Sequence, residues 1–269
     1  MMKRPPAVAG IFYPDVPAVL QQTVSALLDE TVTVNSQPKA IIVPHAGYIY
    51  SGSIAARAYA QLQPAHDLIK KVVLLGPSHR VAFRGLAISS ADYFQTPLGE
   101  VALDRVTLNR LLSLDPVVQL DAAHHDEHSV EVHLPFLQAV LDDFTLIPLV
   151  VGEASPADVC DVLDAIWGGP ETLIVISSDL SHYHDYDTAR AMDSRTSHTI
   201  ETLDYKALHG EDACGCYPLN GLLMCAHKRG LRVTTLDLRN SGDTAGSRDQ
   251  VVGYGAWVLT EPDVIADAR

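Results

Sequence analysis

The sequence predicts an α/β fold, a three-layer αβα sandwich with a mostly parallel central sheet, and two observations predict it. Short β-branched runs alternate with amphipathic stretches along most of the 269 residues. Most of these runs are continuously apolar, which is typical of strands that helices cover on both faces. Because no repeat, low-complexity tract or long polar linker interrupts this pattern, we expect residues 1–269 to form a single domain.

The apolar runs are the predicted strands. In chain order they are Ala40–Val43, Val72–Leu75, Leu86–Ser89, Leu146–Val151, Leu173–Ser177, Val233–Leu238 and Val251–Leu259. For the last of these an antiparallel direction is open, and the order of the strands in the sheet does not follow from the sequence.

The amphipathic stretches between the strands are the predicted helices. They are Val16–Leu28, Ile54–Leu62, Val106–Leu112, Val130–Leu141, Ala157–Ile166, Ala189–Leu203 and Asn220–Arg229. One helix start is well marked, because Ser155 is a good N-cap, Pro156 suits the first helical position and Asp158 places a carboxylate at the third.

The composition is that of a globular protein with a sizeable core, since 47% of the residues are hydrophobic and 19% are charged. The 19 basic and 33 acidic residues give a formal net charge of −14. Such an acidic surface disfavours binding to nucleic acid or to an anionic membrane.

Lys3 and Arg4 precede two prolines rather than an apolar segment, so we expect no secretory signal. No apolar run approaches the ~20 residues that span a bilayer.

The cysteines are too few and too clustered for a disulfide framework. They are Cys160, Cys214, Cys216 and Cys225. The string Cys214-Gly-Cys216 has two readings, a metal-binding pair and a reduced structural pair, and we favour the second. We therefore expect a reduced, cytoplasmic protein.

Polar side chains follow four of the predicted strands. The strings are Pro44-His45-Ala46-Gly47-Tyr48, Gly76-Pro77-Ser78-His79, Ser178-Asp179-Leu180-Ser181-His182 and Ser241-Gly242-Asp243-Thr244. In open α/β sheets, ligand sites form just beyond the carboxyl ends of the strands. A histidine after one strand is ordinarily a loop or capping residue, but three in the same context favour one shared site.

The densest polar segment runs from His124 to His133. His128 and His133 are five residues apart, so they do not share one face of a helix, and the HExxH string of zinc proteases is absent. Two readings stay open for this segment. It is either a solvated, acid-rich helix start, or it brings His128 into the shared site from the side.

Other chemistries are disfavoured by missing motifs. The chain contains no GxGxxG or GxxxxGK[ST] string for nucleotide phosphates and no GxSxG nucleophile elbow.

Two histidines and one carboxylate on an open rim suit divalent iron, with positions left for substrate and dioxygen. The same donors also suit zinc, manganese or copper.

Several strings, in order, resemble the Memo family, whose prokaryotic members are often named AmmeMemoRadiSam system protein B. Those strings include Ala9-Gly10-Ile11-Phe12-Tyr13-Pro14, Pro44-His45-Ala46-Gly47-Tyr48, Leu75-Gly76-Pro77-Ser78-His79, Asp126-Glu127-His128-Ser129-Val130-Glu131-Val132-His133-Leu134-Pro135, Ser177-Ser178-Asp179-Leu180-Ser181-His182 and Asn240-Ser241-Gly242-Asp243. The resemblance covers nearly the whole chain. It implies a fold similar to that of class III extradiol dioxygenases of the LigB type, which bind divalent iron and cleave aromatic diols.

The resemblance also implies residue roles. His45 and His79 match the two metal histidines, and His182 matches the acid/base histidine. The string Glu127-His128-Ser129 is similar to the Asp-His-Gly string of those enzymes, so we expect His182 and His128 to be catalytic. We choose Asp243 as the third ligand. Animal members have a cysteine at the position that we align with Thr244. Residues expected to bind substrate or to support the ligands are Asp179, itself an alternative carboxylate ligand, with His133, Tyr48, Ser78 and Thr244.

The function expected from this resemblance is that of a non-haem Fe(II) dioxygenase-like enzyme acting on a small, aromatic molecule. The alternative is a protein that uses the same cleft to hold a metal or a peptide in signalling, without turnover. The prokaryotic family name further implies radical SAM and AMMECR-like proteins as pathway partners. Fold similarity does not decide between the two functions, because function resides in the site.

Overall fold

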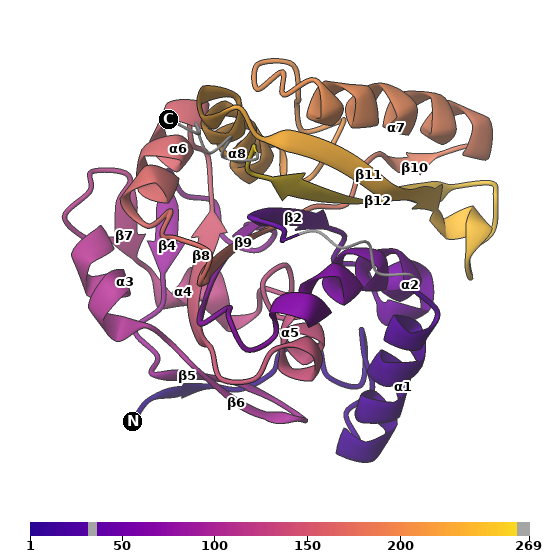
Figure 1. Ribbon diagram of the computed structural model, residues 1–269. Helices are drawn as coiled ribbons and strands as arrows, with labels where there is room; N and C mark the ends of the chain where they lie inside the picture. Colours follow the sequence, from indigo (N-terminus) through magenta and orange to yellow (C-terminus); the bar gives the residue numbers. More distant parts are fainter. Residues whose placement is uncertain (32–36, 263–269) are drawn as a thin grey trace, which may run out of the picture.

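A nine-stranded sheet runs through the middle of the computed structural model, which describes residues 1–31 and 37–262 (Figure 1). Its strands lie in the order β10-β12-β2-β9-β3-β8-β4-β7, and β11 also pairs with β12. Their bounds are β2 Ala40–Val43, β3 Lys71–Pro77, β4 Leu86–Ile88, β7 Val117–Gln119, β8 Thr145–Val151, β9 Thr172–Ser177, β10 His182–His184, β11 Arg232–Asn240 and β12 Val251–Thr260. Every strand expected from an apolar run is present.

The centre of this sheet is parallel and its flanks are antiparallel. β2, β9, β3 and β8 are parallel neighbours, whereas β12 pairs antiparallel with β2 and β11, and β4 pairs antiparallel with β8. The expected α/β class is confirmed, and the sheet is mixed, with a parallel centre and antiparallel neighbours. The antiparallel direction left open for the last strand is the one observed. The four central strands are almost wholly buried because helices cover both faces.

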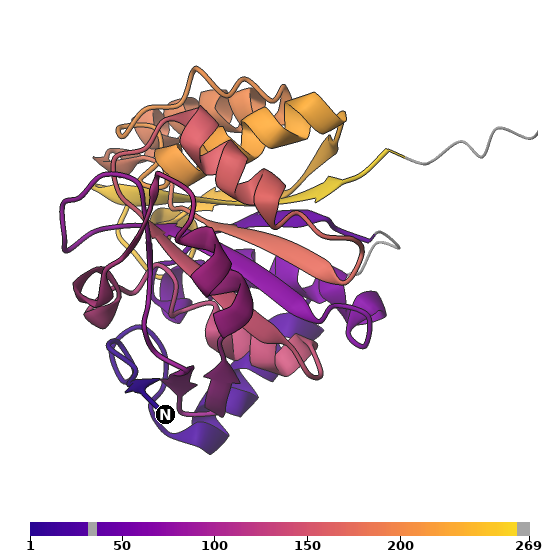
Figure 2. The ribbon, with the colours of Figure 1, turned by 90° about the vertical axis from the view of Figure 1, so that its left-hand side faces the viewer.

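Helices cover the two faces of the sheet in separate groups, which confirms the three layers (Figures 1 and 2). One group consists of α6 (Pro156–Ala165), α7 (Tyr186–Glu201) and α8 (Cys216–Arg229). The other consists of α1 (Pro17–Asp29), α2 (Tyr48–Tyr59), which continues into the 3-10 helix η1 (Ala60–Ala65), and α5 (Leu134–Val140). Two further helices, α3 (Arg105–Leu111) and α4 (Asp121–His125), lie along the chain between β4 and α5. No helix in the described part of the chain is long and apolar enough to cross a membrane.

The predicted helix start at Ser155 is confirmed. Its hydroxyl accepts a hydrogen bond from the Asp158 N–H, and the Asp158 carboxylate accepts one from the Ser155 N–H. In contrast, the helix expected from Val130 begins only at Leu134. The residues before it form turns, and those turns deliver side chains to the site described below.

A small second sheet fixes the N-terminal segment beneath the main one. It pairs β1 (Lys3–Arg4), β5 (Tyr93–Thr96) and β6 (Gly99–Ala102), none of which the sequence pattern predicted. Arg4 is buried and forms an ion pair of 2.7 Å with the fully buried Glu131. That carboxylate also accepts hydrogen bonds from the backbone of Ala7 and Val8 and from the Tyr13 hydroxyl. The N-terminal segment thereby holds the turn that carries His128.

Two cysteines form a disulfide, which contradicts the expectation of a fully reduced chain. Cys160 on α6 and Cys225 on α8 are both buried and are joined across the helix pair, with their Cα atoms 5.5 Å apart. Their separation of 65 residues in sequence hid this contact, because it arises only when the two helices pack. Cys214 and Cys216 are free.

Candidate metal centre

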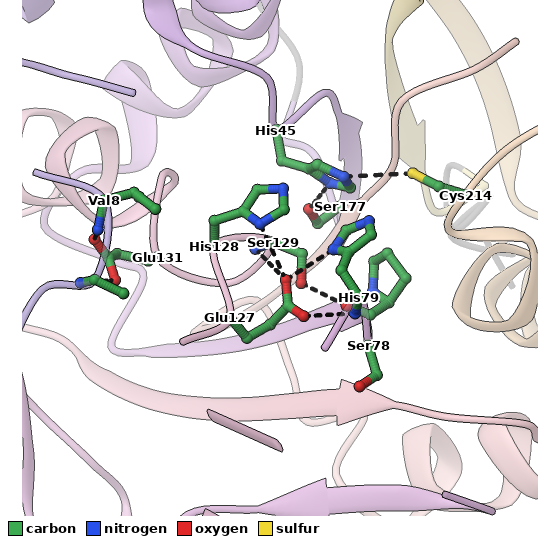
Figure 3. Close-up of polar contacts among 12 residues, drawn as sticks. Val8, His45, Ser78, His79, Glu127, His128, Ser129, Glu131, Ser177 and Cys214 are labelled. Carbon is green, nitrogen blue, oxygen red and sulfur yellow. Dashed lines mark hydrogen bonds and ion pairs between the residues drawn. The ribbon is translucent and has the colours of Figure 1, made fainter. Parts of the chain in front are cut away.

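Three histidines converge at the carboxyl end of the central strands (Figure 3). His45 follows β2, His79 follows β3, and His128 comes from the turn between α4 and α5. Their candidate ligand atoms all lie within 4.8 Å of one another. The ring centroids are 4.5 Å apart for His79 and His128, and 5.1 and 5.3 Å for His45 with each of them. β9 lies between β2 and β3, so the ends of three adjoining strands meet at this place.

The carboxylate of Glu127 holds His79 from behind. Glu127 is fully buried, and its oxygens accept the His79 backbone N–H at 2.6 Å, the His79 Nδ1–H at 2.8 Å and the Ser129 N–H at 2.9 Å. Burial alone would raise the pKa of Glu127, but the hydrogen bonds and charge of His79 outweigh it and hold the pKa at about 2. An ionised Glu127 only accepts hydrogen bonds, so His79 donates its Nδ1–H to this carboxylate and turns its Nε2 to the other side.

A chain of buried hydrogen bonds holds His45 in the same way. Ser177 Oγ lies 2.6 Å from His45 Nδ1 and 2.8 Å from His133 Nε2. Burial lowers the pKa of His133 to about 3, while a hydrogen bond to the backbone carbonyl of Ser129 opposes that shift. Neutral His133 therefore gives its one N–H to this carbonyl, and its Nε2 must accept the Ser177 proton. The Ser177 oxygen in turn accepts the His45 Nδ1–H, which leaves the His45 Nε2 lone pair facing the histidine cluster.

Two of the three rings, His45 and His128, are held in the neutral form that binds metal. Burial, with the neighbouring imidazoles, lowers the pKa of His45 well below its usual value. Burial and then the charge of His79 lower the pKa of His128 to about 4. The Nδ1 of His128 also lies 3.4 Å from the Glu127 carboxylate. Neutral imidazoles with a free lone pair are the ligands that divalent transition metals take in proteins. The donor set therefore fits one such ion.

A thiol that the sequence analysis assigned to a structural pair also reaches this cluster. Cys214 Sγ lies 3.3 Å from His45 Nε2 (Figure 3). The backbone N–H of Asp179 donates to the same sulfur at 3.3 Å. Burial raises the pKa of the Cys214 thiol. Cys214 directly precedes Gly215, the N-cap of α8. Its position just before a helix start was the one feature of the sequence that could have marked Cys214 as a site residue.

The cluster opens into a cleft of about 520 Å³ that also contains Asp179 and His182. The Asp179 carboxylate accepts the His45 backbone N–H at 2.8 Å, and burial raises its pKa to about 7. His182 begins β10, where burial lowers its pKa. Both residues expected after β9 therefore line the same cleft as the three histidines.

The structure does not bring Asp243 or Thr244 into this cleft. Asp243 closes its own turn by accepting the Asn240 N–H at 3.1 Å, and it accepts the Tyr186 hydroxyl at 2.6 Å. Thr244 donates to the Ser241 carbonyl. β11, which precedes this turn, is separated from β2 by β12. The side chain grouped with His45 and His79 is His128, which we had expected to be catalytic.

The remaining expected residues support the surrounding structure. The Tyr48 hydroxyl donates to the Val132 carbonyl, and the Ser78 hydroxyl donates to the Val81 carbonyl. Neither lines the cleft. His133 lies behind His45, as a supporting residue would. Sequence reasoning assigned no role to Glu127 or Ser177, because nothing in the sequence marks a buried carboxylate or hydroxyl as the partner of a particular ring.

Comparisons with known proteins show the family to which the chain belongs. A family model described as Memo-like protein matches residues 4–258. A MEMO1 family protein of Metallosphaera sedula is 34% identical over 94% of this chain and 98% of that protein, and one of Saccharolobus islandicus is 36% identical over the same shares. Among solved structures, an uncharacterized protein from Escherichia coli K12 has a TM-score of 0.51 at 12% identity, covering 81% of this chain and 98% of that chain, a likeness of fold alone. The chain belongs to the Memo family.

Proposed function

We propose that this protein binds one divalent metal ion, iron in the first place, between His45, His79 and His128 and acts as a dioxygenase-like enzyme on a small, aromatic molecule. The observation that carries the proposal is that the ligand atoms of three imidazoles converge within 4.8 Å in the lining of one cleft. Imidazole donors also suit zinc and copper, so metal content after purification identifies the ion.

The chain's own residues supply the rest of a reaction site. An ion bound there would act as a Lewis acid that polarises a substrate oxygen. His182 lies in the same cleft and, since burial lowers its pKa, is neutral near pH 7 and ready to accept a proton. Asp179, with a pKa of about 7, is available both as an acid and as a base at this pH. The cleft therefore combines a metal-ligand set with two groups for proton transfer.

The test uses protein loaded with Fe(II) under anaerobic conditions and a panel of catechols and hydroxyindoles, with dioxygen uptake as the readout. We expect uptake with at least one compound. His182→Ala is expected to keep its metal and to lose turnover by ~10²–10⁴-fold, the usual range for a general acid or base. His184, two residues on and also on β10, provides the matched control, and His184→Ala is expected to change turnover little.

Three outcomes contradict parts of this proposal. Stoichiometric iron without dioxygen uptake on any compound favours a binding protein over an enzyme. Normal turnover in His182→Ala removes its role in proton transfer. Loss of iron from His182→Ala places this residue among the ligands instead.

A further inference from the structure

We propose that Arg80 binds a carboxylate of the substrate, so that the cleft accepts a small anion with an aromatic body. This inference deepens the proposed function, because it takes the cleft beside the three histidines as the substrate site. It adds a charge requirement that neither the histidines nor the family membership implies.

Arg80 is placed at the cleft by its neighbour. His79 is fixed by both its backbone N–H and its ring to Glu127, and Arg80 is the next residue along the chain. Its side chain lines the cleft together with His79 and His128. The geometry therefore places a positive charge beside the candidate ligands.

The guanidinium of Arg80 has no hydrogen bond or ion pair with any residue that the structure describes. Arg4 and Arg239, in contrast, pair with Glu131 and Asp237. An arginine presents five donors in a rigid fork that fits a carboxylate. Arg80 has this fork exposed and uncommitted.

The other groups of the cleft leave this charge unbalanced. Among the lining residues Arg80 is the only lysine or arginine, and Asp179 is the only carboxylic acid. Asp179 is buried and already accepts a hydrogen bond from the His45 backbone N–H. Among the described residues, no ion pair joins Asp179 to Arg80. A bound anion would supply the missing partner.

The remaining walls of the cleft suit an apolar or aromatic body. Phe12, Tyr183 and Tyr254 line it, and Ile11 stands at its edge with 77% of its surface exposed. A cleft of about 520 Å³ is in the range of sites for small molecules. The arrangement of a metal-ligand set, aromatic walls and one arginine fits a small aromatic carboxylate whose ring lies between the arginine and the histidines.

The experiment compares two probes that differ only in charge, protocatechuate and its neutral carboxamide. Binding is measured by calorimetry with metal-free protein and with Zn(II)-loaded protein, since zinc avoids redox chemistry. We expect the acid to bind ~10-fold or more tightly than the amide, with a preference that shrinks as salt is added. Arg80→Gln is expected to remove this preference. Arg84→Gln is the matched control, because Arg84 is an exposed arginine that pairs with Glu153 outside this cleft.

The outcomes separate this inference from the proposed function. Equal affinity for acid and amide, a preference that survives Arg80→Gln, or no binding of either probe overturns the role of Arg80, even if zinc is stoichiometric. Failure to bind zinc contradicts the metal proposal. The role of Arg80 is then still supported if metal-free protein prefers the acid and Arg80→Gln removes that preference. Equal losses in Arg80→Gln and Arg84→Gln point to general charge attraction and overturn the specific contact.

Discussion

Two of the three candidate ligands are oriented by side chains that do not touch the metal position. Glu127 fixes His79, and Ser177 fixes His45. Outer contacts of this kind set the tautomer and direction of a ligating histidine. His45 and His79 were found from the sequence because each follows an apolar strand. Their supporting partners were not, since those contacts depend on how distant turns pack.

Replacing Glu127 tests the first of these contacts. Glu127→Gln keeps the shape of the side chain but removes its charge. The amide nitrogen of the glutamine then faces an N–H group that now donates a hydrogen bond to the Glu127 carboxylate, so that bond is lost. We expect metal affinity to fall by ~10–100-fold, the usual cost of losing such a partner, measured by competition with a chelator. Glu153→Gln, an exposed glutamate, is the control. Unchanged affinity in Glu127→Gln would remove its positioning role.

The hydroxyl of Ser177 makes a second prediction at this scale. In metal-free protein, ¹⁵N NMR of the histidine rings is expected to show His45 with its proton on Nδ1 and His133 with its lone pair on Nε2. Ser177→Ala is expected to let His45 exchange between tautomers and to weaken metal binding, whereas Ser177→Thr keeps the hydroxyl and restores the spectrum. A wild-type His45 protonated on Nε2 would show that the hydrogen-bond chain runs in the opposite direction.

At the scale of elements, the order of the strands explains which predictions succeeded. β2, β9 and β3 are neighbours, so His45, Asp179 and His79 meet. The turn after β11 was chosen by the same rule, but β12 lies between β11 and β2, and Asp243 is occupied by its own turn and by Tyr186. Strand order is a property of long-range pairing that a single sequence pattern does not encode.

The packing of α7 against β12 predicts a pH dependence of stability. Asp193 on α7 is 3% exposed and accepts the Ser181 N–H at 3.0 Å. Burial raises its pKa from 3.8 to about 6, opposed by hydrogen bonds from Ser181 and by the nearby His184. Between pH ~4 and about 6, Asp193 is therefore protonated in the folded state but ionised in the unfolded state. This contribution to stability is complete below pH ~4 and is lost as the pH rises through about 6.

Replacing Asp193 with asparagine tests this pH dependence. The amide oxygen of Asp193→Asn still accepts the Ser181 N–H, but no charge is buried. We expect the variant to be more stable than the wild type at pH 7.5, by up to about 3 kcal/mol, and similar to it near pH 4. Urea unfolding across this range measures the difference. A variant that is less stable at pH 7.5 would mean that the carboxylate is favourably paired.

At the scale of the whole molecule, the apolar runs and their spacing were enough to predict the class of the fold. The structure adds the mixed pairing, the small sheet of β1, β5 and β6, and the disulfide between Cys160 and Cys225. These features arise from contacts between segments far apart in the chain. The same is true of the third histidine, because the N-terminal segment holds the turn that carries His128 through the ion pair between Arg4 and Glu131.

The central claim is that one divalent ion binds between His45, His79 and His128, and metal stoichiometry tests it most directly. Wild-type protein and four alanine variants, at these three histidines and at Asp243, are loaded with Fe(II), passed over a desalting column and analysed for metal, with circular dichroism to confirm folding. We predict one ion per chain in the wild type and in Asp243→Ala, and loss of the ion from each folded histidine variant. Full occupancy in the histidine variants, or loss confined to Asp243→Ala, would contradict the account.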